Sequence, residues 1–329
     1  GSRALNIDGT GLTVNNSGQI IGTGNQRNGT VYADSSAQDF TLNNLTDGLI
    51  DAGAGNQGAG FSVELSAAGN SFDIVNDGAI QGRGTAAAGA TTAGDGLRFE
   101  RTRNGGLLDG SSSGLFAGSI TNSGVIDSEG DSGTTAGIRF VNGVSFNGTI
   151  NNSGTISGVQ NGLYFGNATP AGGGDFTGAI VNNSGTISSG SRALNIDGTG
   201  LVVNNSGSIL GSGAQRNGTV YADGTANNFT LNNTGTIDAG VAGSGVSFQL
   251  GVNDGDTRSF TLVNDGTIAG RGDAQASGAS AGLRLFNGAG AGTTVSVADN
   301  IVNNGPISSE TGPALLIENI DFTGRFINN

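Results

Sequence analysis

The chain has 329 residues, of which 64 are glycine and three are proline, and its net charge at pH 7 is −13. It contains no cysteine, histidine, methionine or tryptophan, and all 13 of its cationic residues are arginine. The charge excludes a basic stripe for nucleic acid. Missing histidine and cysteine exclude Ser-His-Asp and Cys-His catalysis, thiolate or imidazole metal sites and a disulfide framework. An acidic surface of this kind is typical of a soluble, self-repelling extracellular protein.

Three kinds of short apolar segment follow one another along the chain. The first alternates apolar and polar residues, which is the signal of a strand; it occurs at 5–7, 61–65, 97–99, 138–140, 163–165, 248–250 and 283–285. The second ends in asparagine, as at 40–44, 72–76 and 229–233, and the third is a brief Gly-x-Ile-x-Gly, as at 18–22 and 266–270. Frequent glycine and turn dipeptides argue against helices.

One phrase, apolar-x-Asn-[Ser/Asp/Thr/Asn]-Gly-x-Ile, joins the second segment to the third. A fixed motif with elastic spacing is typical of a solenoid whose coils differ in their loops. The motif recurs eleven times, with the last copy cut short, and its anchor residues are Asn16, Asn44, Asn76, Asn122, Asn152, Asn183, Asn205, Asn233, Asn264, Asn303 and Asn329.

Stacking these coils predicts an all-β, parallel β-solenoid of about eleven three-strand coils of roughly 30 residues. Each anchor follows an inward aliphatic residue by two positions, so its amide is predicted to point inward and to bond the amides of neighbouring coils. The glycine two residues later is predicted to adopt φ > 0 at the corner. This ladder is predicted to be structural and not a ligand site, because every coil carries it.

A longer repeat is superimposed on the coils. Residues 1–53 recur almost unchanged from Gly190, an offset of 189 residues, which indicates a duplicated segment at 1–189 and a partial second copy at 190–329. We therefore predict one solenoid over residues 1–329. Because the chain lacks an initiator methionine, we expect it to be a piece of a longer protein.

Few residues suggest chemistry. Paired carboxylates could serve glycoside hydrolysis, with Asp34 and Asp39 or Asp95 and Glu100 as candidates, but we predict that these are solvated loop side chains. Arg98, Arg139 and Arg284 fall at matching outward positions, and no loop combines acids, arginine and aromatic residues as a sugar cleft would. The sequence therefore predicts no catalytic residue and no enzyme activity.

Oxygen-rich turns are the only candidate cation sites. Asp8-Gly9-Thr10-Gly11, Asp197-Gly198-Thr199-Gly200 and Asp254-Gly255-Asp256 could offer oxygen ligands to Ca²⁺, although we interpret them mainly as turn chemistry. No cofactor is predicted. Variable loops at 85–95, 273–281 and 101–113 are where a specific site would lie if the rod has one.

The phrase Asn-Asn-Ser-Gly-Thr-Ile-Ser-Gly at 151–158 and 182–189 resembles the passenger regions of bacterial autotransporters and related large surface adhesins. The resemblance implies a right-handed β-helix, export through the outer membrane and a surface stalk used in adhesion, aggregation or biofilm. It implies no catalytic residue. The C-terminal translocator barrel of that family is not part of these residues.

Three functions follow from these observations. The first is an extracellular stalk or adhesin segment on a bacterial surface, with a host or neighbouring cell surface, self-association or a polysaccharide as partner, and neither nucleic acid nor direct membrane insertion of this segment. The second is a self-assembling surface filament or coat, similar to a sheath or surface layer. The third is a polysaccharide-active β-helix enzyme, which the missing reactive groups disfavour.

Overall fold

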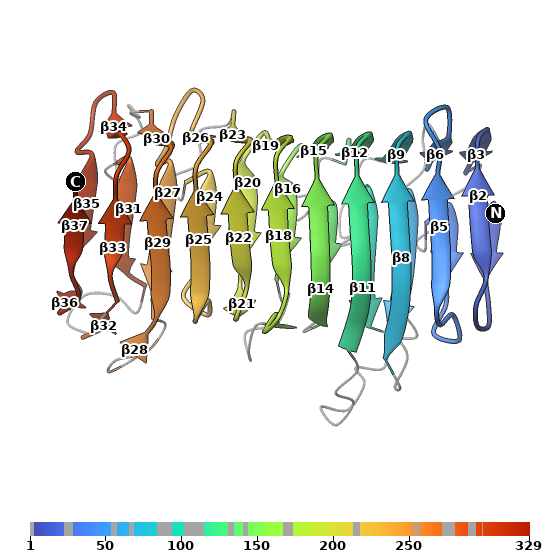
Figure 1. The fold of residues 1–329 in the computed structure, drawn as a ribbon, viewed down its shortest axis with the longest axis horizontal. Helices are drawn as coiled ribbons and strands as arrows, with labels where there is room; N and C mark the ends of the chain where they lie inside the picture. The colour runs from blue at the N-terminus through green and yellow to red at the C-terminus, as the bar shows by residue number, and fades with distance from the viewer. Residues whose placement is uncertain are drawn as a thin grey trace.

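The computed structural model is an elongated stack of coils, with the two termini at opposite ends (Figure 1). Each of the first ten coils contributes one strand to each of three main sheets, which we call the first, second and third sheets in chain order, and the last coil contributes to the first and second sheets. The structure describes residues 3–22, 29–53, 58–65, 69–83, 94–101, 115–130, 135–140, 144–166, 174–212, 218–251, 253, 255, 257–271, 280–288, 294–297 and 299–329.

The strands lie in the sheets in the order in which they occur in the chain. The first sheet contains β1 (Leu5–Ile7), β4 (Val31–Ala33), β7 (Phe61–Leu65), β10 (Leu97–Arg101), β13 (Ala136–Phe140), β16 (Asn161–Phe165), β20 (Arg192–Ile196), β24 (Val220–Ala222), β27 (Val246–Leu250), β31 (Leu283–Asn287) and β35 (Leu315–Glu318). The second contains β2 (Thr13–Asn16), β5 (Phe40–Asn44), β8 (Asn70–Asn76), β11 (Leu115–Asn122), β14 (Ser145–Asn152), β18 (Ile180–Asn183), β22 (Val202–Asn205), β25 (Phe229–Asn233), β29 (Phe260–Asn264), β33 (Ile301–Asn303) and β37 (Phe326–Asn328). The third contains β3 (Gln19–Ile21), β6 (Leu49–Asp51), β9 (Ala79–Gly82), β12 (Val125–Ser128), β15 (Thr155–Gly158), β19 (Thr186–Ser189), β23 (Ser208–Gly211), β26 (Thr236–Asp238), β30 (Thr267–Gly270) and β34 (Ile307–Ser309).

Every pairing within these three sheets is parallel, and the second-sheet pairings from β2 to β33 are in register with the sequence motif. Ile120, Ile150 and Val181, for example, are direct partners in three successive coils. With parallel strands about 4.8 Å apart, eleven coils make a rod about 50 Å long. The prediction of an all-β parallel β-helix is confirmed.

Additional short strands depart from the predicted three strands per coil. They lie between the first and second segments of some coils and form two small sheets. One contains β17 (Gly174–Asp175) and β21 (Gly198–Thr199), and the other contains β28 (Thr257–Arg258), β32 (Ser296–Val297) and β36 (Asp321–Phe322). Two-residue strands leave too little periodicity in the sequence to be predicted.

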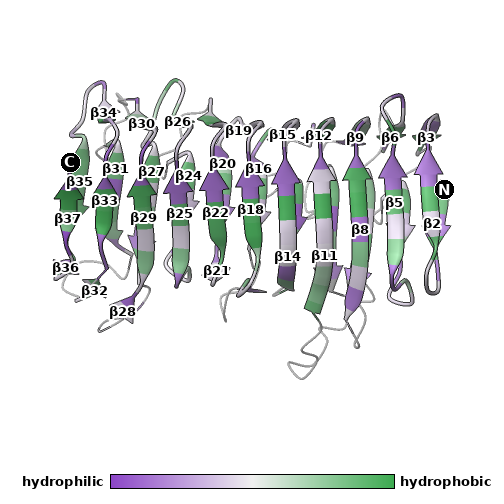
Figure 2. Ribbon diagram, viewed as in Figure 1, coloured by the Kyte–Doolittle hydropathy of each residue, from purple (hydrophilic) through white to green (hydrophobic). Residues whose placement is uncertain are grey.

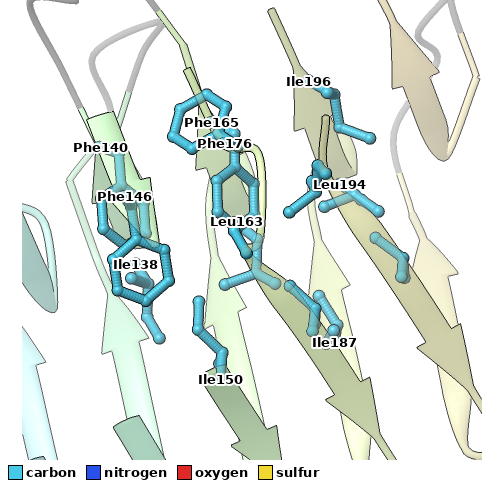
Figure 3. Close-up of a cluster of buried hydrophobic side chains, with 14 of the residues drawn as sticks. Ile138, Phe140, Phe146, Ile150, Leu163, Phe165, Phe176, Ile187, Leu194 and Ile196 are labelled. Atoms are coloured by element: carbon cyan, nitrogen blue, oxygen red, sulfur yellow. The ribbon is translucent and has the colours of Figure 1, made fainter. Parts of the chain in front are cut away.

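Alternation along each strand separates the core from the surface. In β5, Phe40, Leu42 and Asn44 are buried whereas Thr41 and Asn43 are half-buried. The inward residues stack from coil to coil, so that the rings of Phe99 and Phe140 are parallel with their centroids 4.6 Å apart. Figure 3 shows how Phe140 and its neighbours in adjacent coils fill the interior. Because a single coil would leave these side chains in water, each coil depends on its neighbours for burial.

The backbone conformation of the corner glycine differs from the one predicted from the sequence. None of Gly124, Gly154 and Gly185 has a positive φ. A Cβ at Gly154 would instead overlap the carbonyl oxygen of Gly124, and one at Gly185 would overlap that of Gly154. The predicted φ > 0 is therefore wrong, and glycine is needed because successive coils approach closely at this corner.

Within the described residues, there is no helix long and apolar enough to cross a membrane.

Candidate functional site

The anchor asparagines form a continuous inner ladder of side-chain amides. Each Nδ2 donates to the Oδ1 of the next coil, from Asn16 to Asn44 at 2.8 Å through Asn152 to Asn183 at 2.7 Å and on to Asn303. The amides from Asn44 to Asn264 are at most 2% exposed. The predicted inward ladder is confirmed over ten of its eleven residues.

The last anchor is corrected by one residue. Phe326 is the register partner of Ile301, so Asn328, and not Asn329, faces Asn303. Asn303 Nδ2 donates to Asn328 Oδ1 at 2.7 Å. Ile327 and Asn329 fit the apolar-x-Asn spacing equally well one residue later, which is why the sequence motif misplaced the anchor.

The inner amides from Asn16 to Asn233 also donate to the backbone. Asn122 Nδ2 also donates to the carbonyl of Thr155, and Asn152 Nδ2 to that of Thr186, both at 3.1 Å. These bonds tie the end of the second sheet to the start of the third in the following coil. The ladder therefore satisfies buried polar groups that would otherwise destabilise the corner.

A second, outer ladder runs beside the inner one. Asn182 Nδ2 donates to Asn151 Oδ1, Asn204 to Asn182 and Asn232 to Asn204, each at 2.9 Å. Its donors point toward the N-terminus, whereas the inner donors point toward the C-terminus. The motif does not predict this outer ladder, although the doubled Asn-Asn at these positions is a signal from which it could be predicted.

The outer ladder borders a groove of about 390 Å³ along the corner between the second and third sheets. The strand ends that lead into it, on β14, β18, β22 and β25, are hydrophilic (Figure 2). The groove is lined by Thr121, Asn151, Asn152, Ser153, Asn182, Asn183, Ser184, Asn204, Asn205, Ser206, Asn232 and Thr234. It is the candidate binding surface of the rod.

The outer face of the first sheet gathers arginine and tyrosine in one column. Arg98 pairs with Arg139, Arg139 with Tyr164, and Asn195 with Tyr221. Arg284 lies in the same column opposite Ser247, which confirms the matching outward positions. Arginine and tyrosine are therefore brought together by strand register in the first sheet, and not by a single loop.

Two predicted loop carboxylates belong to this face and are not solvated. Asp95 is 1% and Glu100 is 2% exposed. Glu100 pairs with Arg98 at 2.7 Å, and Asp95 accepts from the Ala136 amide at 2.9 Å. Burial raises the pKa of Asp95, while the charges of Arg139 and Arg98 oppose the rise. The burial of both side chains and their contacts with Arg98 and Ala136 suit a structural network.

The other predicted carboxylate pair is not assembled as a site. Asp34 accepts hydrogen bonds from the amide and hydroxyl of Ser36, at 2.8 and 2.6 Å. Asp39 accepts from Ser71 of the next coil, and its φ of 50° marks a left-handed corner. Both carboxylates are therefore engaged in turn and corner contacts.

Two of the candidate calcium turns place carboxylates in pairs. Asp197 accepts from the Tyr164 hydroxyl at 3.0 Å and lies beside Asp223, and Asp8 lies beside Asp34 at the same place in the first copy of the long repeat. In the part of the chain that the structure describes, no three acidic residues gather to hold a metal ion. Asp254 and Asp256, loop residues 85–93 and 273–279, and most of 101–113 lie outside the described residues.

Asp197 makes the stability of the rod depend on pH. Its side chain is buried, and desolvation with the charge of Asp223 raises its pKa from 3.8 to about 8. Between about pH 4 and 8 the folded chain therefore holds a proton that the unfolded chain releases. Stability is expected to fall as the pH rises through this window, by at most about 1.4 kcal/mol per pH unit.

Asp197→Asn tests this expectation. The variant is expected to be more stable than the parent at pH 8 and to show a flatter dependence in urea unfolding from pH 5 to 8. The hydrogen bond with Asp34 also raises the pKa of Asp8, but Asp8 is exposed and screened by solvent, so Asp8→Asn should change the slope much less. Equal slopes for the parent and Asp197→Asn would show that this carboxyl does not titrate in the window.

No protein-family model matches the chain, and neither a curated protein nor a solved structure is detectably similar to it.

Proposed function

We propose that this chain is a stalk segment of an extracellular bacterial surface protein, which carries adhesive contacts away from the cell and adds its own polar surface to them. The observation that supports it most is the unbroken register of eleven coils around one inner amide ladder. A stack of this kind extends in one dimension and keeps its shape because every coil is held by its neighbours.

The surface chemistry fits this proposal. The net charge of −13 favours solubility of the exposed rod, and the groove offers uncharged amides and hydroxyls to a partner, which can be another surface or the same groove of a second rod. The proposed partners are a host or neighbouring cell surface, or another copy of the rod.

Shortening the rod in the surface-displayed parent protein tests the proposal. Deleting residues 17–205 joins Asn16 to Ser206 and keeps the Asn-Ser-Gly motif intact. This removes six coils, or about 29 Å of rod. Cell aggregation and adhesion are expected to fall in the shortened protein at equal surface amount. Unchanged adhesion after removal of the whole segment would contradict a stalk role.

A further inference from the structure

The groove differs from the rest of the molecule in its charge. Its twelve lining residues are all asparagine, serine or threonine, although the chain as a whole carries −13. The absence of any ionised group from the lining disfavours a charged ligand, since nothing there would compensate the desolvation of its charge.

The uncharged tract has a defined length. At the turn position occupied by Ser153, Ser184, Ser206 and Thr234, the coils beyond either end carry Asp77 and Asp265. In the outer amide column the same coils carry Val75 and Val263 in place of asparagine. The tract from Thr121 to Thr234 spans five coils, or about 19 Å along the rod axis.

Each rung of the groove offers both a donor and an acceptor. Asn182 donates one N–H to Asn151 and accepts one from Asn204, which leaves its other N–H and a lone pair for a ligand. The exposed hydroxyls of Ser184 and Ser206 each lie 3.3 Å from a backbone carbonyl of the preceding coil, and their oxygens retain acceptor capacity. The ladders hold these groups in place before a ligand arrives, which lowers the entropic cost of binding.

We propose that this groove binds a neutral, extended polysaccharide with its chain along the rod axis. A row of regularly spaced donors and acceptors suits a polymer that carries closely spaced hydroxyl groups. The lining has no aromatic ring for stacking, so binding at one groove is weak, and its strength on a cell surface comes from many rods acting together. This inference rests on the proposed function and specifies the chemistry of its partner.

Titrating the purified 329-residue chain with soluble polysaccharides tests the proposal. The probes are a β-1,4-glucan oligosaccharide, an α-1,6-glucan and a mannan, with polygalacturonate as the charged comparison. At least one neutral probe is expected to shift the side-chain amide NMR signals of Asn182 and Asn204. Failure of all three neutral probes, or stronger binding of polygalacturonate, would overturn the proposal.

A matched pair of variants locates the site. The double variant Ser184→Glu, Ser206→Glu places two negative charges in the groove, at the turn position that Asp77 and Asp265 occupy beyond its ends, and should weaken binding at least tenfold. Ser188→Glu adds charge on the neighbouring outer face of β19, away from the lining, and should bind as the parent does. Equal weakening by both, with thermal unfolding unchanged, would contradict the assignment. Cell adhesion that still depends on rod length in the double variant would show that the groove is not the site of adhesion. The stalk proposal would stand in that case.

Discussion

Gly154→Ala is expected to destabilise the rod by about 3 kcal/mol, because the added methyl group would overlap the backbone of the preceding coil. The methyl group would overlap the carbonyl oxygen of Gly124 and the backbone of Ser123. Because all of these are backbone atoms, the overlap can be relieved only if the two coils move apart. The glycine is not in the left-handed region, so steric exclusion between coils, and not backbone strain, accounts for the loss.

The first coil supplies the matched control. Gly18 occupies the same motif position, but a Cβ there would have nothing within 4 Å. Gly18→Ala should therefore be neutral or slightly stabilising, since alanine reduces the entropy of the unfolded chain. Urea unfolding midpoints of the two variants measure the difference. A Gly154→Ala midpoint equal to that of Gly18→Ala would show that the corner does not pack as closely as described.

Asn183→Ala is expected to cost about 3 kcal/mol through loss of the inner ladder at its centre. Asn183 accepts from Asn152 and donates to Asn205, both at 2.7 Å. Its removal leaves a buried donor on one side and a buried acceptor on the other without a partner, and it opens a small void at the corner.

The neighbouring amide is the control for this second variant. Asn182 makes similar bonds at the half-buried outer ladder, where water can replace a lost partner. Asn182→Ala should therefore cost less than about 1 kcal/mol. Chemical denaturation with circular dichroism compares them. Equal losses from the two substitutions would contradict the distinction between a buried structural ladder and an outer one.

The repeating part of the fold could be predicted because each coil carries the same pattern of inward apolar residues followed by an asparagine. Alternation such as that of Phe40, Thr41 and Leu42 identifies the inward face, and the asparagine after it identifies the corner. The error at Asn329 arose where two registers satisfy the same spacing. The error in glycine conformation arose because contact between coils, and not local φ, selects the residue at Gly154.

The outer faces could not be predicted in the same way. Burial of Asp95 and Glu100 depends on what stands beside them in other coils, and residues such as Arg98 and Arg139 are 41 positions apart in the chain but direct partners in the sheet. The groove similarly exists only once five coils are stacked. A doubled asparagine in the sequence indicates an outer ladder. Only the strand register shows that the coils with uncharged groove residues are neighbours in the stack.

Hydrogen exchange of side-chain amides measured by NMR tests the central claim most directly. If the buried inner ladder holds the coils together, the Nδ2 protons of its residues Asn152, Asn183 and Asn205 should exchange slowly. The Nδ2 protons of Asn151, Asn182 and Asn204 in the outer ladder should exchange far faster. Equally rapid exchange of both sets at neutral pH would contradict the account.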